Sequence, residues 1–562
     1  MEFRSRVQVG AARSRCIRSR DGDYGCRLDR RMLERGLGLV ILIWTGLSLS
    51  SVEAAEPVYI RRVVVNTAEV FGPEEDRGFL NRGANALHVV TLESTVRRLL
   101  IFEEGDVYDP AVLAEAERNL RALGLFRSVS IVAGEVRDGV VDVQVNTQDA
   151  WTVQVGLSAG SGGGDMRGGI ALGEKNFLGT GSQLRFAFAK DQERTYRSVE
   201  LLTPNFLLPF TTAHVLYANN SDGSARILEV RRPFYSTAAP WSAEIAYADT
   251  RRDEFTYAEG GAVQSTYGAD HFRLLAAYGV ALPAEEGNAS RLSIGLDLRE
   301  DRFRAASTGG TEPDALPADR RFRYVFLQYE VLHSDFLKWN YVNHDVRYED
   351  IGVGPRLLLR LGISPAAFGV AETTGIVGAE VGAGFRVGAS GFVQARVGFD
   401  SRVGPSLENS LLSANVLYVR RFETAPRQTF IAQIAALRGW NLDRDVQIFA
   451  DAQAGLRAYH LRAFEGDTRV ILNLEHRIFS GRQLFGLISP GVAVFADAGL
   501  VGGPMRSLSL SEIKVDAGVG LRLAMAWAPV MNVFRIDAGY AFQRDPTGHR
   551  GWLISFSTGQ AF

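Results

Sequence analysis

The stretch GLRAYHLRAFEGDTRVILNLEHRIF, residues 455–479, decides the fold of this 562-residue chain. Its second half alternates strictly, so that Asn473, Glu475 and Arg477 share one face of an extended strand. Apolar side chains fill the other face, namely those of Val470, Leu472, Leu474 and Ile478. In a soluble sandwich the charged face would meet water and the apolar face would meet a core. The remaining sequence favours the reverse arrangement, with charges inside and apolar side chains outside.

Stripes of the same kind recur through residues 149–562. Runs of roughly ten residues alternate between apolar and polar side chains, separated by Gly, Asp, Asn and Pro. In residues 182–190, for example, Leu184, Phe186 and Phe188 share one face. Lipid requires such an apolar face, whereas a watery lumen allows a polar one. We therefore predict an antiparallel transmembrane β-barrel over residues 149–562, since a soluble sandwich or propeller gives no reason for an apolar outer face.

The N-terminal region has the pattern of an export signal. Residues 37–50 are 14 largely apolar residues, too few to span a bilayer as a helix. They follow a basic stretch and precede a small-x-Ala pattern at residues 52–54. We therefore expect residues 1–54 to be a secretory signal region that is cleaved after Ala54. We expect translation to start at Met32, because the leader then has an ordinary length.

Composition argues against several classes of function. The formal net charge is -2, which gives no indication of a nucleic-acid partner. Both cysteines, Cys16 and Cys26, precede the apolar run, so we expect neither a disulfide nor a thiolate catalyst in the exported chain. The eight histidines show no metal-ligand spacing, and we expect no metal or cofactor. Residues 156–160 match the G-x-S-x-G pattern around Ser158, but a glycine-rich hairpin tip follows instead of a helix, so we do not expect an enzyme.

Residues 55–148 predict a small α+β domain with the order β-α-α-β-β. An Asp-Pro pair at residues 109–110 favours a helix start. Apolar residues then recur at helical spacing, at Leu113, Ala116, Leu120 and Leu123. Two strands are predicted at residues 126–133 and 140–146, and the Asp-Gly pair at residues 138–139 is typical of a tight hairpin between them.

This domain resembles a POTRA domain, the periplasmic module of outer-membrane assembly factors. The segments FEEGDVYD (residues 102–109) and NLRALGLFRSVSI (residues 119–131) carry the resemblance. It implies one POTRA domain that captures an extended client on a sheet edge by β-augmentation. We assign this client-binding edge to the strand residues Ser128, Val129, Ser130, Ile131 and Val132.

The opening stretch resembles the inward-folded sixth extracellular loop of the BamA/TamA-like surface-antigen barrels. Arg457 takes the place of that motif's arginine, Ala458 replaces its glycine and Tyr459 is its aromatic residue. A Gly-Asp turn at residues 466–467 and the Glu-x-Arg strand mark at residues 475–477 follow. If the motif requires a positive φ at Ala458, alanine costs on the order of 1 kcal/mol against glycine. The Arg-Gly-Trp triplets at 438–440 and 550–552 lack the turn and strand at this spacing.

A second motif of the same family, F-x-D-x-G, matches Phe495, Asp497 and Gly499. Alternation places Glu475 and Asp497 on the lumen side of their strands. They then supply carboxylate partners for Arg457 when the loop folds into the barrel, since the planar guanidinium makes bidentate hydrogen bonds to carboxylates.

The resemblance implies a barrel of 16 antiparallel strands in the bacterial outer membrane, with the POTRA domain in the periplasm. The implied function is to insert proteins into the outer membrane or move them across it. Two alternatives stay open: a dedicated secretion pore for one partner and a passive surface-antigen pore. The expected partners are outer-membrane lipids, unfolded outer-membrane or secreted clients, and periplasmic chaperones or accessory proteins. We expect the last strand to form a weak seam with the first and to carry a C-terminal insertion signal, at Trp552, Ile554, Phe556, Gly559 and Phe562.

Overall fold

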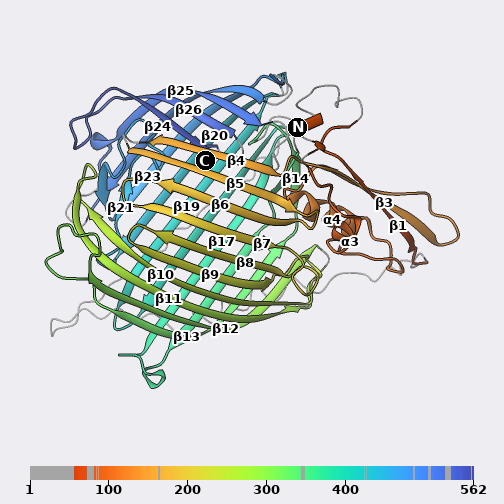
Figure 1. Ribbon diagram of the computed structural model, residues 1–562, viewed down its shortest axis with the longest axis horizontal. Coiled ribbons are helices and arrows are strands. Elements are labelled where there is room, and N and C mark those ends of the chain that lie inside the picture. The colour runs from red at the N-terminus through yellow and green to blue at the C-terminus, as the bar shows by residue number, and fades with distance from the viewer. Residues whose placement is uncertain are drawn as a thin grey trace, which may run out of the picture. The chain divides into compact units, whose positions relative to one another are not determined.

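Two kinds of sheet, one small and one closed, account for most of the chain in the computed structural model (Figure 1). The structure describes residues 56–562 except 73–81, 84, 87, 163–164, 286, 344–347, 423, 426, 485–487, 504–507, 526–532, 559 and 562. The predicted signal region, residues 1–54, therefore falls outside the described residues, as do Gly559 and Phe562. Residues Pro57–Phe562 form one compact unit.

The small sheet belongs to the predicted α+β domain. Its elements are β1 (Tyr59–Ala68), α3 (Glu93–Arg97), α4 (Pro110–Ala122), β2 (Phe126–Ala133) and β3 (Val140–Asp149). The sheet order is β1-β3-β2, with β1 parallel and β2 antiparallel to the central strand β3. This order of elements confirms the predicted β-α-α-β-β arrangement.

Local sequence explains the helix and the hairpin of this domain. The Asp109 side chain accepts a hydrogen bond from the amide of Ala111 at 2.7 Å, which caps α4 as expected. The helix buries Leu113, Ala116 and Leu120 against the sheet. Asp138 and Gly139 both have positive φ values, 52° and 75°, as the tight turn between β2 and β3 requires.

The second sheet is a closed barrel in which each strand pairs with its neighbour. Its order begins at β10, runs to β27 and returns through β4 to β9. The strands are β4 (Val153–Gly162), β5 (Asp165–Phe177), β6 (Ser182–Lys190), β7 (Thr195–Thr203), β8 (Thr212–Asn220), β9 (Gly223–Arg232), β10 (Trp241–Tyr257), β11 (Val263–Leu282), β12 (Asn288–Ala305), β13 (Arg320–His333), β16 (Arg356–Ser364), β17 (Thr374–Val387), β18 (Gly391–Val403), β19 (Leu407–Arg421), β20 (Gln428–Trp440), β23 (Thr468–Phe479), β24 (Ile488–Gly502), β25 (Lys514–Met525), β26 (Val533–Ala541) and β27 (Trp552–Thr558).

Within the described residues, 20 strands close the barrel, so the expectation of 16 strands is not confirmed. The difference arises because many hairpin connections are short. Residues 221–222 alone join β8 to β9, and residues 388–390 join β17 to β18. Alternation of side chains shows that a segment is a strand, but it does not fix how many strands share a given length of chain.

Short elements lie in the connections between barrel strands. Between β13 and β16, β14 (Phe336–Trp339) pairs with β15 (Glu349–Gly352). Between β20 and β23, β21 (Ile448–Ala450) pairs with β22 (Phe464–Gly466). Two 3-10 turns, η1 (Ala366–Phe368) and η2 (Leu510–Glu512), lie in other connections.

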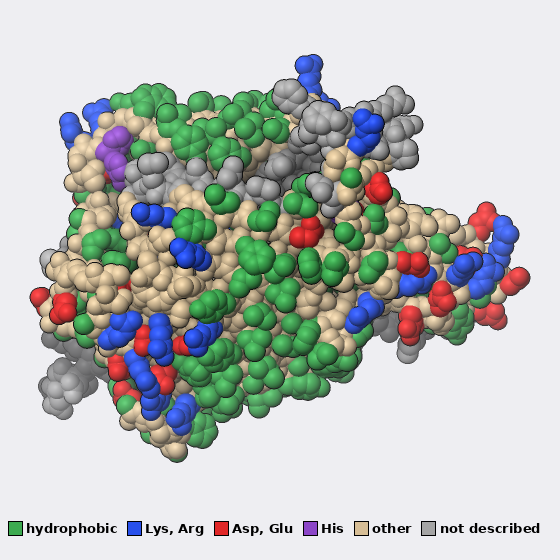
Figure 2. Space-filling model, in the orientation of Figure 1, with side chains coloured by type: hydrophobic (Ala, Val, Ile, Leu, Met, Phe, Trp, Pro, Cys, Tyr) green, Lys and Arg blue, Asp and Glu red, His purple; other side chains and the backbone are tan. Residues whose placement is uncertain are grey.

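The barrel wall is apolar outside and polar inside. In β24, Val492 and Val494 are 47% and 54% exposed, whereas Phe495 and Asp497 on the other face are 3% and 1% exposed. Figure 2 shows hydrophobic side chains spread over the wall between the two ends of the barrel, and charged side chains gathered at those ends. The charged face of the opening stretch therefore points into the lumen, as the sequence predicts.

The domain that is predicted to be a POTRA domain identifies the two ends of the barrel. Its helix α4 contacts the connection between β9 and β10, where Glu115 accepts a hydrogen bond from the Thr237 amide at 2.9 Å. Arg98 donates to the carbonyl of Asn205, between β7 and β8, at 2.9 Å. These connections lie at one end of the barrel, here called the POTRA end. None of the helices in the described part of the chain is long and apolar enough to cross a membrane.

Candidate functional site

Arg457 lies buried in the barrel between two carboxylates of the lumen wall. Its Nε and Nη2 donate to the two carboxylate oxygens of Asp497 at 2.7 and 2.8 Å. Its Nη1 donates to Glu475 Oε2. The side chains of Arg457, Glu475 and Asp497 are 4%, 0% and 0% exposed. We call these three residues the Arg457 clamp.

Charge complementarity stabilises the clamp. Burial on its own lowers the pKa of Arg457, but the hydrogen bonds and charges of Asp497 and Glu475 raise that pKa above its ordinary value. The guanidinium therefore stays charged, and so it keeps both carboxylates paired in a site from which water is excluded. Removing one partner of a buried ion pair typically costs about 3–5 kcal/mol, because the remaining charge stays buried without compensation.

The loop that carries Arg457, residues 441–467, joins β20 to β23 and folds back into the barrel; we call it the capping loop. A turn around Asp451 shapes its inner part. Asp451 accepts hydrogen bonds from the amides of Gln453 and Ala454, both at 2.9 Å, and from the amide of Arg462 at 2.8 Å. Gly455 follows with φ +119°, which side chains rarely tolerate, and a Cβ there would meet Asn473 at 2.8 Å. The first glycine of the quoted stretch is therefore required by its conformation.

Phe495 and Gly499, the first and last residues of the F-x-D-x-G motif, both contact the capping loop. The guanidinium of Arg457 stacks 3.7 Å above the centre of the Phe495 ring. A Cβ at Gly499 would lie 2.9 Å from the buried side chain of Leu456. Phe495 therefore forms a platform for the arginine, and Gly499 leaves space for its neighbour in the loop.

Ala458 does not have the positive φ angle that would favour a glycine at this position. Positive φ values among non-glycine residues of the loop occur at Asn441 and Arg462, and not at Ala458. The cost considered for alanine at this position therefore does not arise. Ala458 is fully buried, and its methyl group lies 3.0 Å from where a Cβ at Gly539 in β26 would stand.

Tyr459 anchors the loop to the last strands of the barrel. Its ring is fully buried, and its hydroxyl lies 2.8 Å from Gln543 Oε1 and 3.0 Å from the carbonyl of Val515. Burial raises the pKa of Tyr459 to about 12, so the hydroxyl keeps its proton for these two acceptors. Nδ1 of the next residue, His460, lies 2.6 Å from Oδ2 of Asp545, in the connection between β26 and β27.

Three further polar side chains form hydrogen bonds with the clamp residues and were not assigned to the site from the sequence. Asn473 donates to Asp497 Oδ1 and to the carbonyl of Gly455, both at 2.7 Å. Arg477 donates to Glu475 Oε1 at 2.7 Å, and Arg522 reaches Glu475 Oε2 at 3.3 Å. All three stand on the polar faces of alternating strands, which was the signal available in the sequence.

The opposite side of the capping loop is held by hairpins at the far end of the barrel. Arg462 donates to Glu193 Oε1 at 2.6 Å and stacks 3.5 Å above the ring of Tyr257. The Tyr257 hydroxyl donates to the same carboxylate oxygen at 2.6 Å. Gln447 and Tyr257 exchange hydrogen bonds between side chain and backbone, both at 2.8 Å. The loop therefore bridges two separate parts of the barrel wall.

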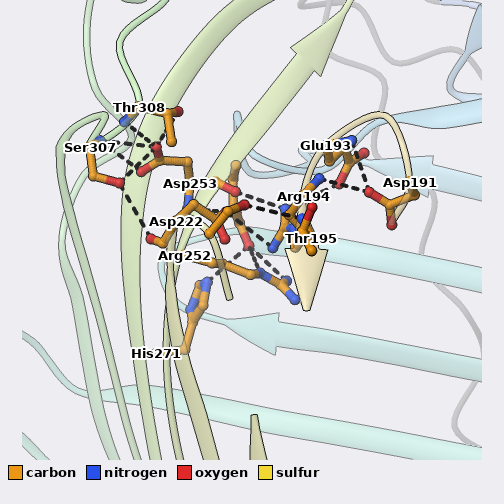
Figure 3. A network of polar contacts seen from close by, with 12 residues as sticks. Asp191, Glu193, Arg194, Thr195, Asp222, Arg252, Asp253, His271, Ser307 and Thr308 are labelled. Carbon is orange, nitrogen blue, oxygen red and sulfur yellow. Dashed lines mark hydrogen bonds and ion pairs between the residues drawn. The ribbon is translucent and has the colours of Figure 1, made fainter. Parts of the chain in front are cut away.

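Glu193 belongs to a wider network of polar contacts at this end (Figure 3). Its neighbour Arg194 donates to the carbonyl of Asp253 at 2.9 Å. The buried carboxylate of Asp253 accepts hydrogen bonds from the amides of Ser307 and Thr308, at 2.9 and 2.8 Å. This network ties the connections after β6 and β12 to β10, so the capping loop rests on a braced set of hairpins.

The capping loop was expected to be the sixth loop on its side of the barrel, and the structure places it differently. At the end opposite the POTRA domain, it is the eighth connection between successive barrel strands, not the sixth, because of the additional strands. Ser158 lies inside β4, opposite Gly169 of β5, and not at a strand-to-helix turn. Its surroundings in the chain are therefore not those of a nucleophile elbow.

The structure shows where the strands lie that are predicted to form the client-binding edge and the seam. Residues 128–132 lie in β2, an edge strand of the order β1-β3-β2. The last strand β27 neighbours the first strand β4 and closes the barrel. In β27, Trp552 and Ile554 are 65% and 54% exposed, so they face outward, and Phe556 is partly buried.

A closed antiparallel barrel with an apolar outer wall and a polar lumen is the architecture of outer-membrane proteins. Residues 88–148 match the POTRA family model, described as a surface antigen variable number repeat. A 135-residue stretch, 24% of this chain, is 26% identical to the outer membrane protein assembly factor BamA of Neorickettsia risticii (strain Illinois). The chain therefore combines an N-terminal α+β domain, which matches the POTRA model over residues 88–148, with a closed β-barrel whose outer wall is apolar.

The match to the Neorickettsia protein spans 18% of that protein's length. Among solved structures, CdiB from Acinetobacter baumannii is 13% identical, with a TM-score of 0.47 over 90% of this chain and 74% of that one. BamA from Haemophilus ducreyi lacking POTRA domains 1–3 is also 13% identical, with a TM-score of 0.37 over 89% and 84% of the two chains.

Proposed function

We propose that this protein inserts proteins into the bacterial outer membrane or moves them across it, without covalent chemistry. The observation that carries the proposal is the Arg457 clamp, which holds a long loop inside a barrel that a POTRA domain accompanies. A passive pore gives no reason to bury an arginine between two carboxylates at the cost of their hydration. A moving assembly factor needs its loop held in one defined position while the wall around it changes.

The client is received on the POTRA domain. Strand β2 pairs with β3 on one side only, so an extended client segment can add to its other edge. Main-chain hydrogen bonds provide affinity without strict demands on client sequence, and Ser128, Val129, Ser130, Ile131 and Val132 form this edge. Periplasmic chaperones or accessory proteins deliver the client, and outer-membrane lipids surround the barrel.

The client then leaves through the seam between β4 and β27. Of these two strands, β27 has seven residues, fewer than the roughly 9–11 expected of a transmembrane strand. A short strand offers few ladder hydrogen bonds, which favours opening at this point. Disulfides placed between β4 and β27 without loss of insertion activity would contradict this route.

Quantitative proteomics of outer membranes tests the function directly. Cells that lack the protein are complemented with the wild type, with Arg457→Ala, or with Arg438→Ala as a matched control. Arg438 is an exposed arginine on β20 that stacks on Trp440 and lies outside the clamp. We expect several barrels to fall without the protein and to be restored by the wild type and by Arg438→Ala only.

A dedicated secretion pore for one partner is the second candidate, because the closed wall encloses a polar lumen through which an unfolded chain can pass. In that case one secreted protein accumulates in the periplasm while outer-membrane barrels keep their levels. The same proteomic experiment, extended to the periplasmic fraction, separates the two functions.

A further inference from the structure

The strands β11, β12 and β13 are longer than a bilayer requires. They contain 20, 18 and 14 residues, whereas roughly 9–11 residues of a tilted strand span the hydrocarbon core. Strand β12 runs from the POTRA end toward the opposite end of the barrel, here called the far end, and β13 returns from it. The side chains on the outer face of these strands show where the bilayer ends.

The outer face changes from apolar to charged at one level of β12 and β13. Leu296 and Val325 oppose each other in the two strands and are 39% and 37% exposed. Four residues nearer the far end, Glu300 opposes Arg321, and Arg323 lies between Val325 and Arg321 on the same face. In Figure 2, charged side chains gather at the far end of the apolar wall. Since lipid tails require an apolar face, the bilayer surface crosses both strands at this level.

A groove with a volume of about 350 Å³ lies on this boundary. Its apolar lining comes from β11, β12 and the turn η1 between β16 and β17, namely from Phe272, Leu298 and Phe368. Its charged lining comes from Glu300, Arg321 and Arg323. The two phenylalanine side chains are 36% and 41% exposed, so the groove continues the lipid-facing wall up to the first charged residues.

The arginines beside the groove carry more charge than their acidic partner neutralises. Glu300 Oε1 accepts hydrogen bonds from Arg302 and from Arg321, both at 2.6 Å, so two guanidinium groups share one carboxylate. Arg323 Nη1 donates to the carbonyl of Phe368, and no carboxylate in the described part of the chain forms an ion pair with this arginine. Three guanidinium groups and one carboxylate leave a net charge of +2 at the groove.

The other carboxylates in this region have partners of their own. Asp270 and Asp319 both lie near Arg302. Asp270 pairs with Arg304, and Asp319 accepts a hydrogen bond from the amide of Phe303 at 2.8 Å. Neither carboxylate lines the groove, so its cationic character remains.

We propose that this groove binds a phosphorylated lipid of the leaflet at the far end of the barrel. The phosphate lies against Arg321 and Arg323, and an acyl chain of the same molecule lies against Phe272, Leu298 and Phe368. Arginine suits this role because its planar guanidinium forms two parallel hydrogen bonds with phosphate oxygens and stays charged. A lipid satisfies both parts of the groove at once, whereas a free phosphate would leave the apolar part uncovered.

Native mass spectrometry of the purified full-length protein in detergent measures this binding directly. The probe is dimyristoyl phosphatidic acid, which carries both a phosphate monoester and two acyl chains. Dimyristoylglycerol lacks the phosphate and glycerol phosphate lacks the chains, so these two compounds test each part of the groove separately. We expect one saturable site for phosphatidic acid, and binding of both comparison compounds that is weaker by about tenfold or more.

Two variants change the two parts of the groove. Arg323→Gln removes the guanidinium that has no carboxylate partner, and we expect the affinity for phosphatidic acid to fall about tenfold. Phe368→Ser changes an exposed turn outside the barrel strands, and we expect several-fold weaker binding. Arg251→Gln is the matched control, because Arg251 is exposed on the outer face of β10, three strands away from Arg323 in the sheet order. We expect this control to bind as the wild type does.

Heat-modifiable migration in gels establishes that each barrel is folded, and Arg321→Gln replaces Arg323→Gln if the latter does not fold. Wild-type affinity in the arginine variant and in Phe368→Ser overturns the proposal. An equal loss in Arg251→Gln shows a diffuse attraction to surface charge and also overturns it. Glycerol phosphate that binds as tightly as phosphatidic acid overturns the choice of a lipid, and dimyristoylglycerol that does so overturns the role of the arginines. No client is present, so each of these failures leaves the proposed function standing.

Discussion

Arg457 and Asp497 stand 40 residues apart in the chain and meet through two parallel hydrogen bonds of 2.7 and 2.8 Å inside the barrel. The geometry is the bidentate fork that only arginine can present to a carboxylate. It fixes both the position and the direction of the loop residue. A lysine at this position would retain the charge but supply a point contact in place of a fork.

Replacing Arg457 should release the capping loop. Arg457→Ala leaves Glu475 and Asp497 buried without this partner, and a loss of about 3–5 kcal/mol in the stability of the seated loop is expected. Arg457→Lys should lose less than the alanine variant, because the charge remains. Hydrogen exchange of the amides between Asp451 and Ala463 measures the change. Exchange in Arg457→Ala as slow as in Arg438→Ala would show that the clamp does not hold the loop.

Replacing Asp497 should loosen the capping loop even when the new side chain has the same shape. It accepts hydrogen bonds from Arg457 and, through Oδ1, from Asn473 as well. Asp497→Asn keeps the shape but removes the charge and turns one acceptor into a donor that faces the guanidinium. We expect faster loop exchange than in the wild type, by at least tenfold, which corresponds to about 1.4 kcal/mol. An unchanged exchange rate would place the restraint on Glu475 alone.

A methyl group should be tolerated at Ala458 or at Gly539, but not at both positions at once. A Cβ at Gly539 would lie 3.0 Å from the Ala458 methyl group, so Gly539→Ala overpacks the seat of the loop at a cost of about 1–3 kcal/mol. The double variant Ala458→Gly, Gly539→Ala moves the methyl group to the opposite wall and should recover most of that loss. Thermal unfolding in detergent provides the measurement. No recovery in the double variant would mean that these two residues do not pack against each other.

The contact between Glu117 of α4 and Lys338 of β14, whose side chains lie 3.0 Å apart, should weaken in acid. Burial on its own raises the pKa of Glu117, but hydrogen bonds from Lys338 and the Ile131 amide and the charges of Arg121 and Lys338 hold this pKa below its ordinary value of 4.5. The stabilisation from ionised Glu117 is therefore complete above pH 4.5 and is lost as the pH falls through the lowered pKa. Hydrogen exchange of the β14 amides, corrected for the intrinsic pH dependence of exchange, should stay constant from pH 7 to about 4.5 and become faster below it. Glu117→Gln should remove the pH-dependent component that this carboxylate contributes.

The sequence predicts the clamp because its members lie in short motifs on alternating strands. Arg457 is marked by the turn and strand that follow it, and alternation places Glu475 and Asp497 on one side of the wall. It does not predict the contact between Arg477 and Val342, which are 135 residues apart and belong to no shared motif. Nor does periodicity fix the number of strands, because it carries no information on how a sheet closes. Alanine fits at position 458 because its φ angle is not positive and because Gly539 of another strand leaves space for the methyl group. Neither fact can be read from the sequence around Ala458.

In the proposed function, the protein inserts other proteins into a membrane only when its capping loop is seated in the barrel. Liposomes that contain the purified full-length protein are given an unfolded outer-membrane barrel as client, and folding is followed by protection from protease. We predict faster folding with the wild type and with Arg438→Ala than with empty liposomes, and a rate near that of empty liposomes with Arg457→Ala. Equal rates for wild-type and empty liposomes would contradict the insertion function. Equal rates for the wild type and Arg457→Ala, both above empty liposomes, would contradict the role of the clamp.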